Sequence, residues 1–334
     1  MMNYELFKEV VTEKFKDFIP EEFKDYNLDV HQVTKVNQTM DAINLVAAGE
    51  AKYSVAPTIY INTMYEHYKN CEDLQEVLQS AAETMTQAYK NAPQVGSVMN
   101  FENAKDNIVM ALINTEQNKE MLENVPNRQF QDLSIIYRWV VDTDVKGISS
   151  TIMNNSLAES MGLTEKEIYK AAVQNTSRLF PPTVKSINEV ICEMMMADGM
   201  PPEVADIMTG EVPPENAMYV ISNSRGIDGA VSMLYEENLH KLAEELQNDL
   251  YIMPSSRHEV IAVSASMGDP NELAQLVAEI NMDQVALDER LSNQVYHYDK
   301  DLRKLSLATD TPNKRLDGIV VEPKLIYDSK SQSR

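Results

Sequence analysis

The segment YIMPSSRHEV, residues 251–260, gathers serine, arginine, histidine and glutamate between two apolar runs. Hydroxyl, imidazole and carboxylate groups are the ones that hydrolases use to activate a nucleophile. Neighbouring side chains of an extended chain point to opposite faces, however, and catalytic triads are assembled from residues far apart in sequence. The pattern therefore favours a polar corner between two strands, with a ligand-binding role as the alternative to be tested. The candidate ligand-binding residues are Ser255, Ser256, Arg257, His258 and Glu259.

A second candidate lies in SRGIDG, residues 224–229, where two glycines are spaced Gly-x-x-Gly. Phosphate-binding loops of this kind need a helix N-terminus directly after the glycines. Here the sequence predicts strands on both sides, so we expect a hairpin turn in which Gly226 and Gly229 relieve backbone strain. Arg225 would lie at the tip of this turn and is a further candidate ligand-binding residue.

The sequence predicts no metal site, no cofactor and no assigned catalytic residue. The five histidines are scattered, and there is no His-Glu-x-x-His, Cys-x-x-Cys or EF-hand pattern. There is also no Gly-x-Ser-x-Gly nucleophile elbow and no P-loop.

The elements that would position these residues alternate between strand pairs and single helices. In the last third we expect the order ββαββαββ, which predicts an antiparallel sheet with helices packed on it. Its helix starting at residue 269 has an N-cap aspartate followed by proline and, two residues later, glutamate. The predicted strands cover residues 218–223, 229–234, 249–256, 258–265, 293–298 and 303–308.

The N-terminal part shows the same mixture of elements. An amphipathic helix is predicted over 2–18, a hairpin over 31–48, and a buried strand over 133–142. Thr164 and Glu167 have the spacing of a capping box, which starts another helix. We therefore predict an α+β protein with mixed or antiparallel sheets in two lobes. The expected divisions are 1–196, a Met- and Pro-rich linker or excursion at 197–217, a C-terminal lobe at 218–310, and a poorly ordered tail at 311–334.

The net negative charge of the chain limits which classes of macromolecule it can bind. The chain of 334 residues has a net charge of −23, and an acidic surface repels phosphate backbones, so we expect no nucleic-acid binding. We find no uninterrupted apolar run of the roughly 18 residues that a membrane span needs. Cys71 and Cys192 lie far apart in helix-like segments, which fits reduced thiols in a cytoplasmic protein.

Several long strings support a resemblance, among them YVISNSRGIDGAVSMLY, LAEELQNDLYIMPSSRHEVIAV and VAPTIYINTMYEHY. They resemble a bacterial family of unknown function from Gram-positive anaerobes with a Pro-Ser-Ser-x-His-Glu-Val signature. The string TEKEIYKAAVQNTSRLFPP is distantly similar to the uncharacterised YtpQ-like family. The resemblance covers the chain to about Asp299 and implies a cytoplasmic bacterial protein. It brings no catalytic residue, and residues 193–217 and the tail after Asp310 look like additions.

Three functional hypotheses follow. The leading one is a non-catalytic cytoplasmic binding or accessory protein with an unknown protein partner, contacted through the tail or the Met-rich stretch. Methionine surfaces adapt to varied partners. The second is a hydrolase-like enzyme that uses His258 and Arg257 with groups from the other lobe. The third is an acidic antagonist that mimics nucleic acid.

Overall fold

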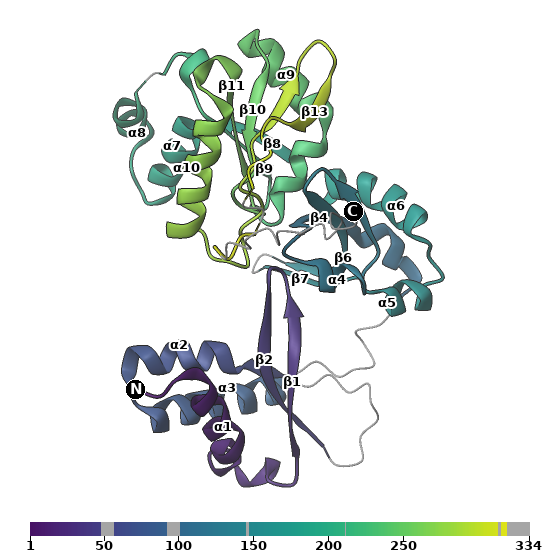
Figure 1. Cartoon of the computed structure of the whole chain (residues 1–334), viewed down its shortest axis with the longest axis vertical. Coiled ribbons are helices and arrows are strands. Elements are labelled where there is room, and N and C mark those ends of the chain that lie inside the picture. Colours follow the sequence, from purple (N-terminus) through teal and green to yellow (C-terminus); the bar gives the residue numbers. More distant parts are fainter. Residues whose placement is uncertain (48–56, 92–100, 145–146, 211, 313–314, 319–334) are drawn as a thin grey trace, which may run out of the picture. The chain divides into compact units, whose positions relative to one another are not determined.

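The computed structural model describes residues 1–47, 57–91, 101–144, 147–210, 212–312 and 315–318 (Figure 1). The chain forms two compact units. The first comprises Met1–Asn107 with Trp139–Thr151, and the second comprises Ile108–Arg138 with Ile152–Arg334. The fold is α+β with three antiparallel sheets, as the alternation of strand pairs and helices predicts.

The first unit packs helices against a three-stranded sheet of order β1-β2-β3. The predicted hairpin is confirmed, and its turn contains Asn37 at φ 63°, a left-handed conformation that asparagine tolerates. Tyr4 and Lys8 both donate to Asp41 of β2, at 2.8 and 2.7 Å, and fasten α1 to the hairpin. The elements are α1 (Tyr4–Lys14), η1 (Phe15–Asp17), η2 (Glu21–Phe23), β1 (Asn27–Lys35), β2 (Gln38–Val46), β3 (Thr58–Tyr60), α2 (Ile61–Cys71), α3 (Leu74–Asn91) and η4 (Phe101–Asn107).

A hydrophobic core fills the space between these helices and the sheet. Its side chains recur at helical spacing on one face of α1 and of α3, which is why both helices form amphipathic elements here. The fully buried members include Phe7, Val11, Phe15, Ile43, Leu45, Ile61 and Met85.

A second sheet has the order β4-β6-β5, with β7 paired to β6. Every residue of β4 is buried, and α6 covers it through Thr176, whose hydroxyl accepts from Met110 N at 2.8 Å. The predicted capping box of Thr164 and Glu167 is confirmed at the start of α6. The elements are β4 (Ile108–Asn114), α4 (Lys119–Leu122), β5 (Asn127–Phe130), β6 (Leu133–Asp144), β7 (Gly147–Ile152), α5 (Asn155–Ser160) and α6 (Glu165–Leu179).

The third sheet, in the second unit, has six strands in the order β13-β12-β10-β11-β9-β8. Helix α10 packs on it through Ala274 and Val277, against Met253, Val263 and Val295. The elements are β8 (Pro182–Ser186), α7 (Ile187–Ala197), α8 (Pro202–Thr209), η5 (Pro214–Asn216), β9 (Tyr219–Asn223), η6 (Gly229–Leu234), α9 (Glu236–Leu246), β10 (Leu250–Met253), β11 (Val260–Ser264), η7 (Ala265–Met267), α10 (Pro270–Asp283), β12 (Tyr296–Asp299) and β13 (Lys304–Leu307).

One predicted strand is wrong. Residues 229–234 form the 3₁₀ segment η6, so β9 has no hairpin partner there. A short apolar run is compatible with a buried strand or a buried helical turn, and periodicity cannot separate the two. Asp228 enters η6 at φ 50°, and the segment is buried from Gly229 to Met233. Strand β9 pairs instead with β11 and β8.

The stretch predicted as a linker, 197–217, lies within the second unit. It continues from α7 through a short loop into α8, which begins at Pro202. In Figure 1, α8 lies at the outer margin of its unit, with α7 between it and the sheet.

Candidate functional site

The corner of the opening segment joins β10 to β11, which are antiparallel neighbours. Main-chain hydrogen bonds pair it with residues 289–292, as between two strands of a sheet. The N–H groups of Leu291 and Ser292 donate to Ser255 O and Pro254 O, both at 2.9 Å, and Arg257 N donates to Glu289 O at 2.8 Å. The corner is therefore fixed by main-chain bonds to the segment before β12, as an internal part of the fold.

The serine and histidine of this corner do not form a nucleophile–base pair. Ser256 is buried, and its hydroxyl accepts from His258 N at 3.0 Å. The imidazole Nδ1 accepts from Asp228 N at 3.2 Å, while Nε2 lies 3.5 Å from a carboxylate oxygen of Glu289. Both ring nitrogens thus face groups other than a hydroxyl or thiol that the imidazole could activate. Ser255 and Glu259 are half-buried beside them.

Arg257 reaches a carboxylate from the neighbouring turn. Its Nε and Nη2 lie 2.8 and 2.7 Å from Asp228 Oδ1, and Arg138 of β6 approaches Oδ2 at 3.5 Å. Burial of the Arg138 guanidinium lowers its pKa, and the nearby Asp228 charge counteracts this. One buried carboxylate therefore bridges two guanidinium groups and fastens the turn at 224–229 to the corner.

The two glycines of this turn have different structural roles. Gly226 has φ +63°, in the left-handed region. Gly229 is needed for close packing, because a Cβ there would lie 2.2 Å from Ser222 Oγ and 2.4 Å from His258 O. Arg225 is exposed, and its backbone N–H donates to Asn223 Oδ1 at 2.9 Å.

The sequence did not single out Asp228, Arg138 or Glu289. Arg138 lies in a strand far along the chain, and no spacing rule links it to Arg257. Asp228 precedes a glycine in a predicted turn, which is the only signal that it adopts a special backbone conformation.

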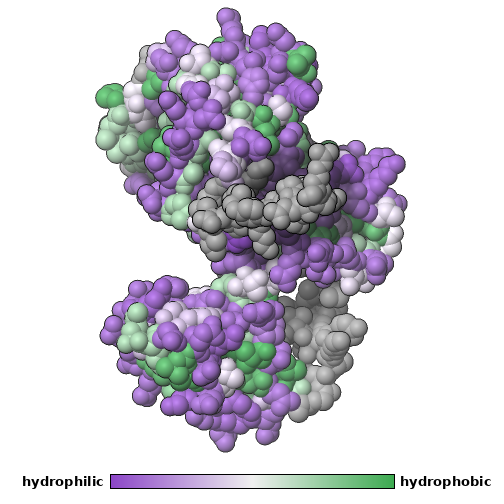
Figure 2. All heavy atoms as spheres, viewed as in Figure 1, coloured by the Kyte–Doolittle hydropathy of each residue, from purple (hydrophilic) through white to green (hydrophobic). Residues whose placement is uncertain are grey.

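A different surface stands out by its exposure. We call α7, α8 and their connection, residues 187–209, the Met-rich hairpin. Eight of the eleven residues of α7 are apolar, yet within the two helices only Cys192 and Ala205 are buried. Ile207 is 81% exposed. Figure 2 shows hydrophobic side chains at the place where Figure 1 labels α8. The exposed large apolar side chains are Ile191, Met194, Met196, Val204, Ile207 and Met208.

The Met-rich hairpin is held together by a few polar contacts. The Cys192 thiol donates to Asp206 Oδ1 at 3.2 Å, and this hydrogen bond raises the pKa of the thiol. Asn188 Nδ2 donates to Thr209 O at 3.0 Å, which fixes the end of α8 against the start of α7. The two helices therefore keep a defined arrangement while their apolar side chains face outward.

A groove runs between the Met-rich hairpin and the edge of the third sheet. It has a volume of about 1010 Å³ and includes Cys192, Met196, Asp206, Val212 and Tyr219 in its lining. Residues 187–209 contain five acidic side chains and no lysine, arginine or histidine. The adjoining Lys185 pairs with Glu193 at 2.7 Å. The surface is thus apolar and anionic together.

Across the described ranges, no three His, Cys, Asp or Glu side chains are grouped so that they could hold a metal ion. None of the helices in this part of the chain is both long enough and apolar enough to cross a bilayer.

Comparison with known proteins gives one relationship. Neither curated proteins nor solved structures give a match. A model of a family of unknown function, DUF5688, matches residues 4–300, which include the corner, the Asp228 cluster and the Met-rich hairpin. The expected membership in a family of unknown function is thereby confirmed, and residues 193–217, which look like an addition in the sequence, lie inside the match. The chain belongs to the DUF5688 family.

Proposed function

We propose that the chain is a non-catalytic protein-binding module, and that its Met-rich hairpin receives a cationic amphipathic helix of a partner protein. The observation that carries the proposal is the exposure of Ile207, Met208 and Met194, at 81%, 61% and 64%, on a hairpin that contains no basic residue. Exposed apolar patches rimmed by polar groups mark interaction surfaces on soluble proteins.

Chemistry specifies the partner. Methionine side chains are flexible and polarisable, so they adapt to differently shaped apolar faces. An amphipathic helix docks into such a surface through anchors spaced i, i+3, i+4 and i+7. Five carboxylates around the apolar side chains favour lysine and arginine on the flanks of that helix, because complementary charge raises the association rate and selects the partner.

Two other hypotheses receive less support. The hydrolase hypothesis lacks a nucleophile beside His258, whose two nitrogens face a backbone N–H and a carboxylate. A nucleic-acid mimic needs carboxylates in a continuous stripe with phosphate-like spacing, whereas Met194 and Met196 interrupt the acidic residues of the Met-rich hairpin. The mixture favours a protein partner.

The test uses a synthetic helical peptide with leucine at i, i+3, i+4 and i+7 and lysine on both flanks. Fluorescence anisotropy of the labelled peptide measures its binding to the full chain. We expect binding that weakens as salt rises, because the charge contribution is screened. A peptide with the same leucines and glutamate in place of lysine serves as the charge control and should bind at least tenfold more weakly.

Matched variants distinguish specific binding at the Met-rich hairpin from nonspecific hydrophobic binding elsewhere on the surface. Ile207→Ser with Met208→Gln should weaken binding at least tenfold, since the loss of two anchors of about 1 kcal/mol each exceeds the 1.4 kcal/mol of a tenfold change. Leu302→Ser removes a similarly exposed apolar side chain, at 74%, far from the Met-rich hairpin along the chain. Equal affinity of both variants for the cationic peptide would refute the proposal.

A further inference from the structure

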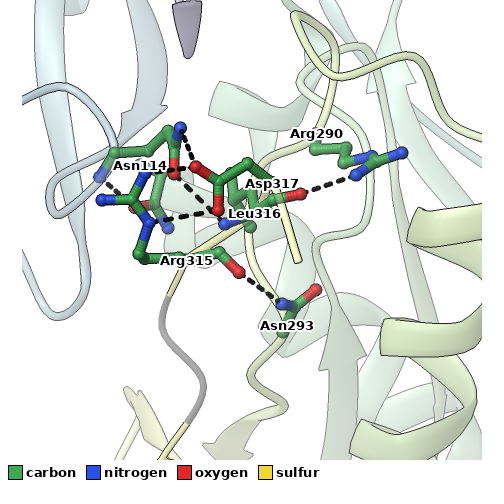
Figure 3. A network of polar contacts seen from close by, with 7 residues as sticks. Asn114, Arg290, Asn293, Arg315, Leu316 and Asp317 are labelled. Carbon is green, nitrogen blue, oxygen red and sulfur yellow. Dashed lines mark hydrogen bonds and ion pairs between the residues drawn. The ribbon is translucent and has the colours of Figure 1, made fainter. Parts of the chain in front are cut away.

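Part of the predicted tail is bound to the second unit. Residues 311–312 and 315–318 are described, and Leu316 is only 1% exposed. Figure 3 shows Arg315, Leu316 and Asp317 lying among side chains from two other segments. The bound segment lies beyond the family match, which ends at residue 300.

The side chains around the segment bind its main chain. Leu316 N donates to Gln117 Oε1 at 3.3 Å, and Arg290 Nη1 donates to Leu316 O at 2.6 Å. Asn293 Nδ2 donates to Arg315 O at 3.3 Å. Three side chains thus bind the backbone of two consecutive residues, as in other sites that recognise extended peptides.

Side-chain recognition adds specificity to this main-chain binding. Leu316 is buried, and Asp317 Oδ2 accepts from Gln117 Nε2 at 3.4 Å. Arg315 pairs with Asp317 within the segment, its Nε lying 3.1 Å from Oδ1. Gly318 follows at φ +75°, and a Cβ there would lie 2.9 Å from Met282 Cε. The site therefore recognises the buried leucine and the following aspartate, while Arg315 holds Asp317 in place within the segment.

The binding residues are also held by bonds that do not involve the segment. Arg290 Nε donates to Val285 O at 2.8 Å, and Asn293 Oδ1 accepts from Asn281 Nδ2 at 2.8 Å. Gln117 N donates to Asn114 Oδ1 at 2.9 Å. Because these bonds fix the site independently, removal of the segment should leave the site in shape, and a preorganised site binds with less loss of entropy.

We infer that Gln117, Arg290 and Asn293 form a peptide-binding site for an extended Arg-Leu-Asp-Gly segment, occupied in cis by residues 315–318. The cis segment is a displaceable occupant. A tethered ligand acts at an effective concentration on the order of millimolar, so it excludes the same sequence offered in trans until it is released.

The test uses the full chain with Leu316→Asp, which places a charge at a buried position and should release the segment. A labelled peptide with the sequence of residues 310–319, DTPNKRLDGI, is then titrated by fluorescence anisotropy. We expect it to bind the Leu316→Asp chain at least tenfold more tightly than the native chain. Addition of Gln117→Ala should abolish that gain, whereas Gln129→Ala, an exposed glutamine, should preserve it.

Two results would overturn the inference: equal affinity for the native and Leu316→Asp chains, or equal affinity of the released chain for a control peptide with aspartate in place of leucine. If the Leu316→Asp chain does not fold, native-state hydrogen exchange decides. The Leu316 amide should be protected, yet exchange through a local opening faster than the Ile252 amide in β10. Protection equal to that of Ile252, or no protection, rejects a displaceable occupant.

Discussion

Arg257 and Asp228 join two loops of the second unit through a guanidinium–carboxylate pair whose Nε–Oδ1 distance is 2.8 Å. The carboxylate is nearly buried, and Arg138 lies on its other oxygen. The cluster therefore links the 224–229 turn to the β10–β11 corner. We expect its loss to lower the free energy of unfolding.

Asp228→Asn should destabilise the chain by about 3 kcal/mol, because it leaves two partly buried guanidinium groups without their shared charge. Asparagine retains the shape and tolerates the left-handed backbone at this position, so the loss reports the ion pairs. Urea unfolding measures it, with the exposed Asp301→Asn as control. A change below about 0.5 kcal/mol, the usual range for surface substitutions, contradicts the fastening role.

Gly229→Ala should destabilise by about 1–3 kcal/mol or more, because its new Cβ overlaps Ser222 Oγ and His258 O. Combining it with Ser222→Ala removes the overlap with the hydroxyl and leaves those with the main chain, so it should restore part of the loss. Gly268→Ala is the matched control, because nothing lies within 4 Å of its Cβ position and φ there is extended. Thermal unfolding of the three variants checks the order; equal effects at 229 and 268 argue against the close packing described.

Glu236 predicts a pH effect. Its hydrogen bonds to Arg303 lower its pKa from 4.5 to about 2. A folded-state pKa below the unfolded value gives stability that is present above the unfolded value and is lost as the pH falls toward the folded one. The stability advantage of the native chain over Glu236→Gln should therefore shrink between pH 4.5 and 2. Urea titrations at several pH values measure it, and parallel curves for the two chains would count against this pair.

The two thiols should react at different rates. The hydrogen bond to Asp206 raises the pKa of Cys192, which is also buried, and the thiolate is the reactive species. Iodoacetamide should modify Cys71 faster, as mass spectrometry of timed samples would show. Asp206→Asn should speed modification of Cys192, while Glu203→Gln, on the same helix, should not. The same rate at Cys192 in all three chains contradicts the Cys192–Asp206 contact.

Much of the fold could be predicted from local sequence signals. The capping box at Thr164 and the N-cap at Asp269 mark helix starts that depend only on neighbouring residues. The strand pairs of the last third followed from alternating apolar runs and turns. The 3₁₀ segment at residues 229–234 could not be predicted in this way. Its residues are buried on all sides, so the alternation of apolar and polar residues that distinguishes a strand from a helix is missing.

The sites were harder to predict because they depend on tertiary contacts. The segment YIMPSSRHEV was recognisable, but nothing in it shows that Ser256 accepts from the His258 backbone or that Arg138 joins Asp228. The bound Leu316 lies in a charged tail, and its site combines Gln117 with Arg290 and Asn293. The high methionine content of the Met-rich hairpin is evident from the sequence, whereas the exposure of its side chains is evident only from the structure.

The most direct test of the proposed function is an NMR titration of the full chain, labelled with ¹³C at its methionine methyl groups, with the cationic amphipathic peptide. The account predicts shifts at Met194, Met196 and Met208 of the Met-rich hairpin, while the buried Met85, Met110 and Met233 stay in place. Saturating peptide that leaves the three hairpin methyl groups unshifted would contradict it.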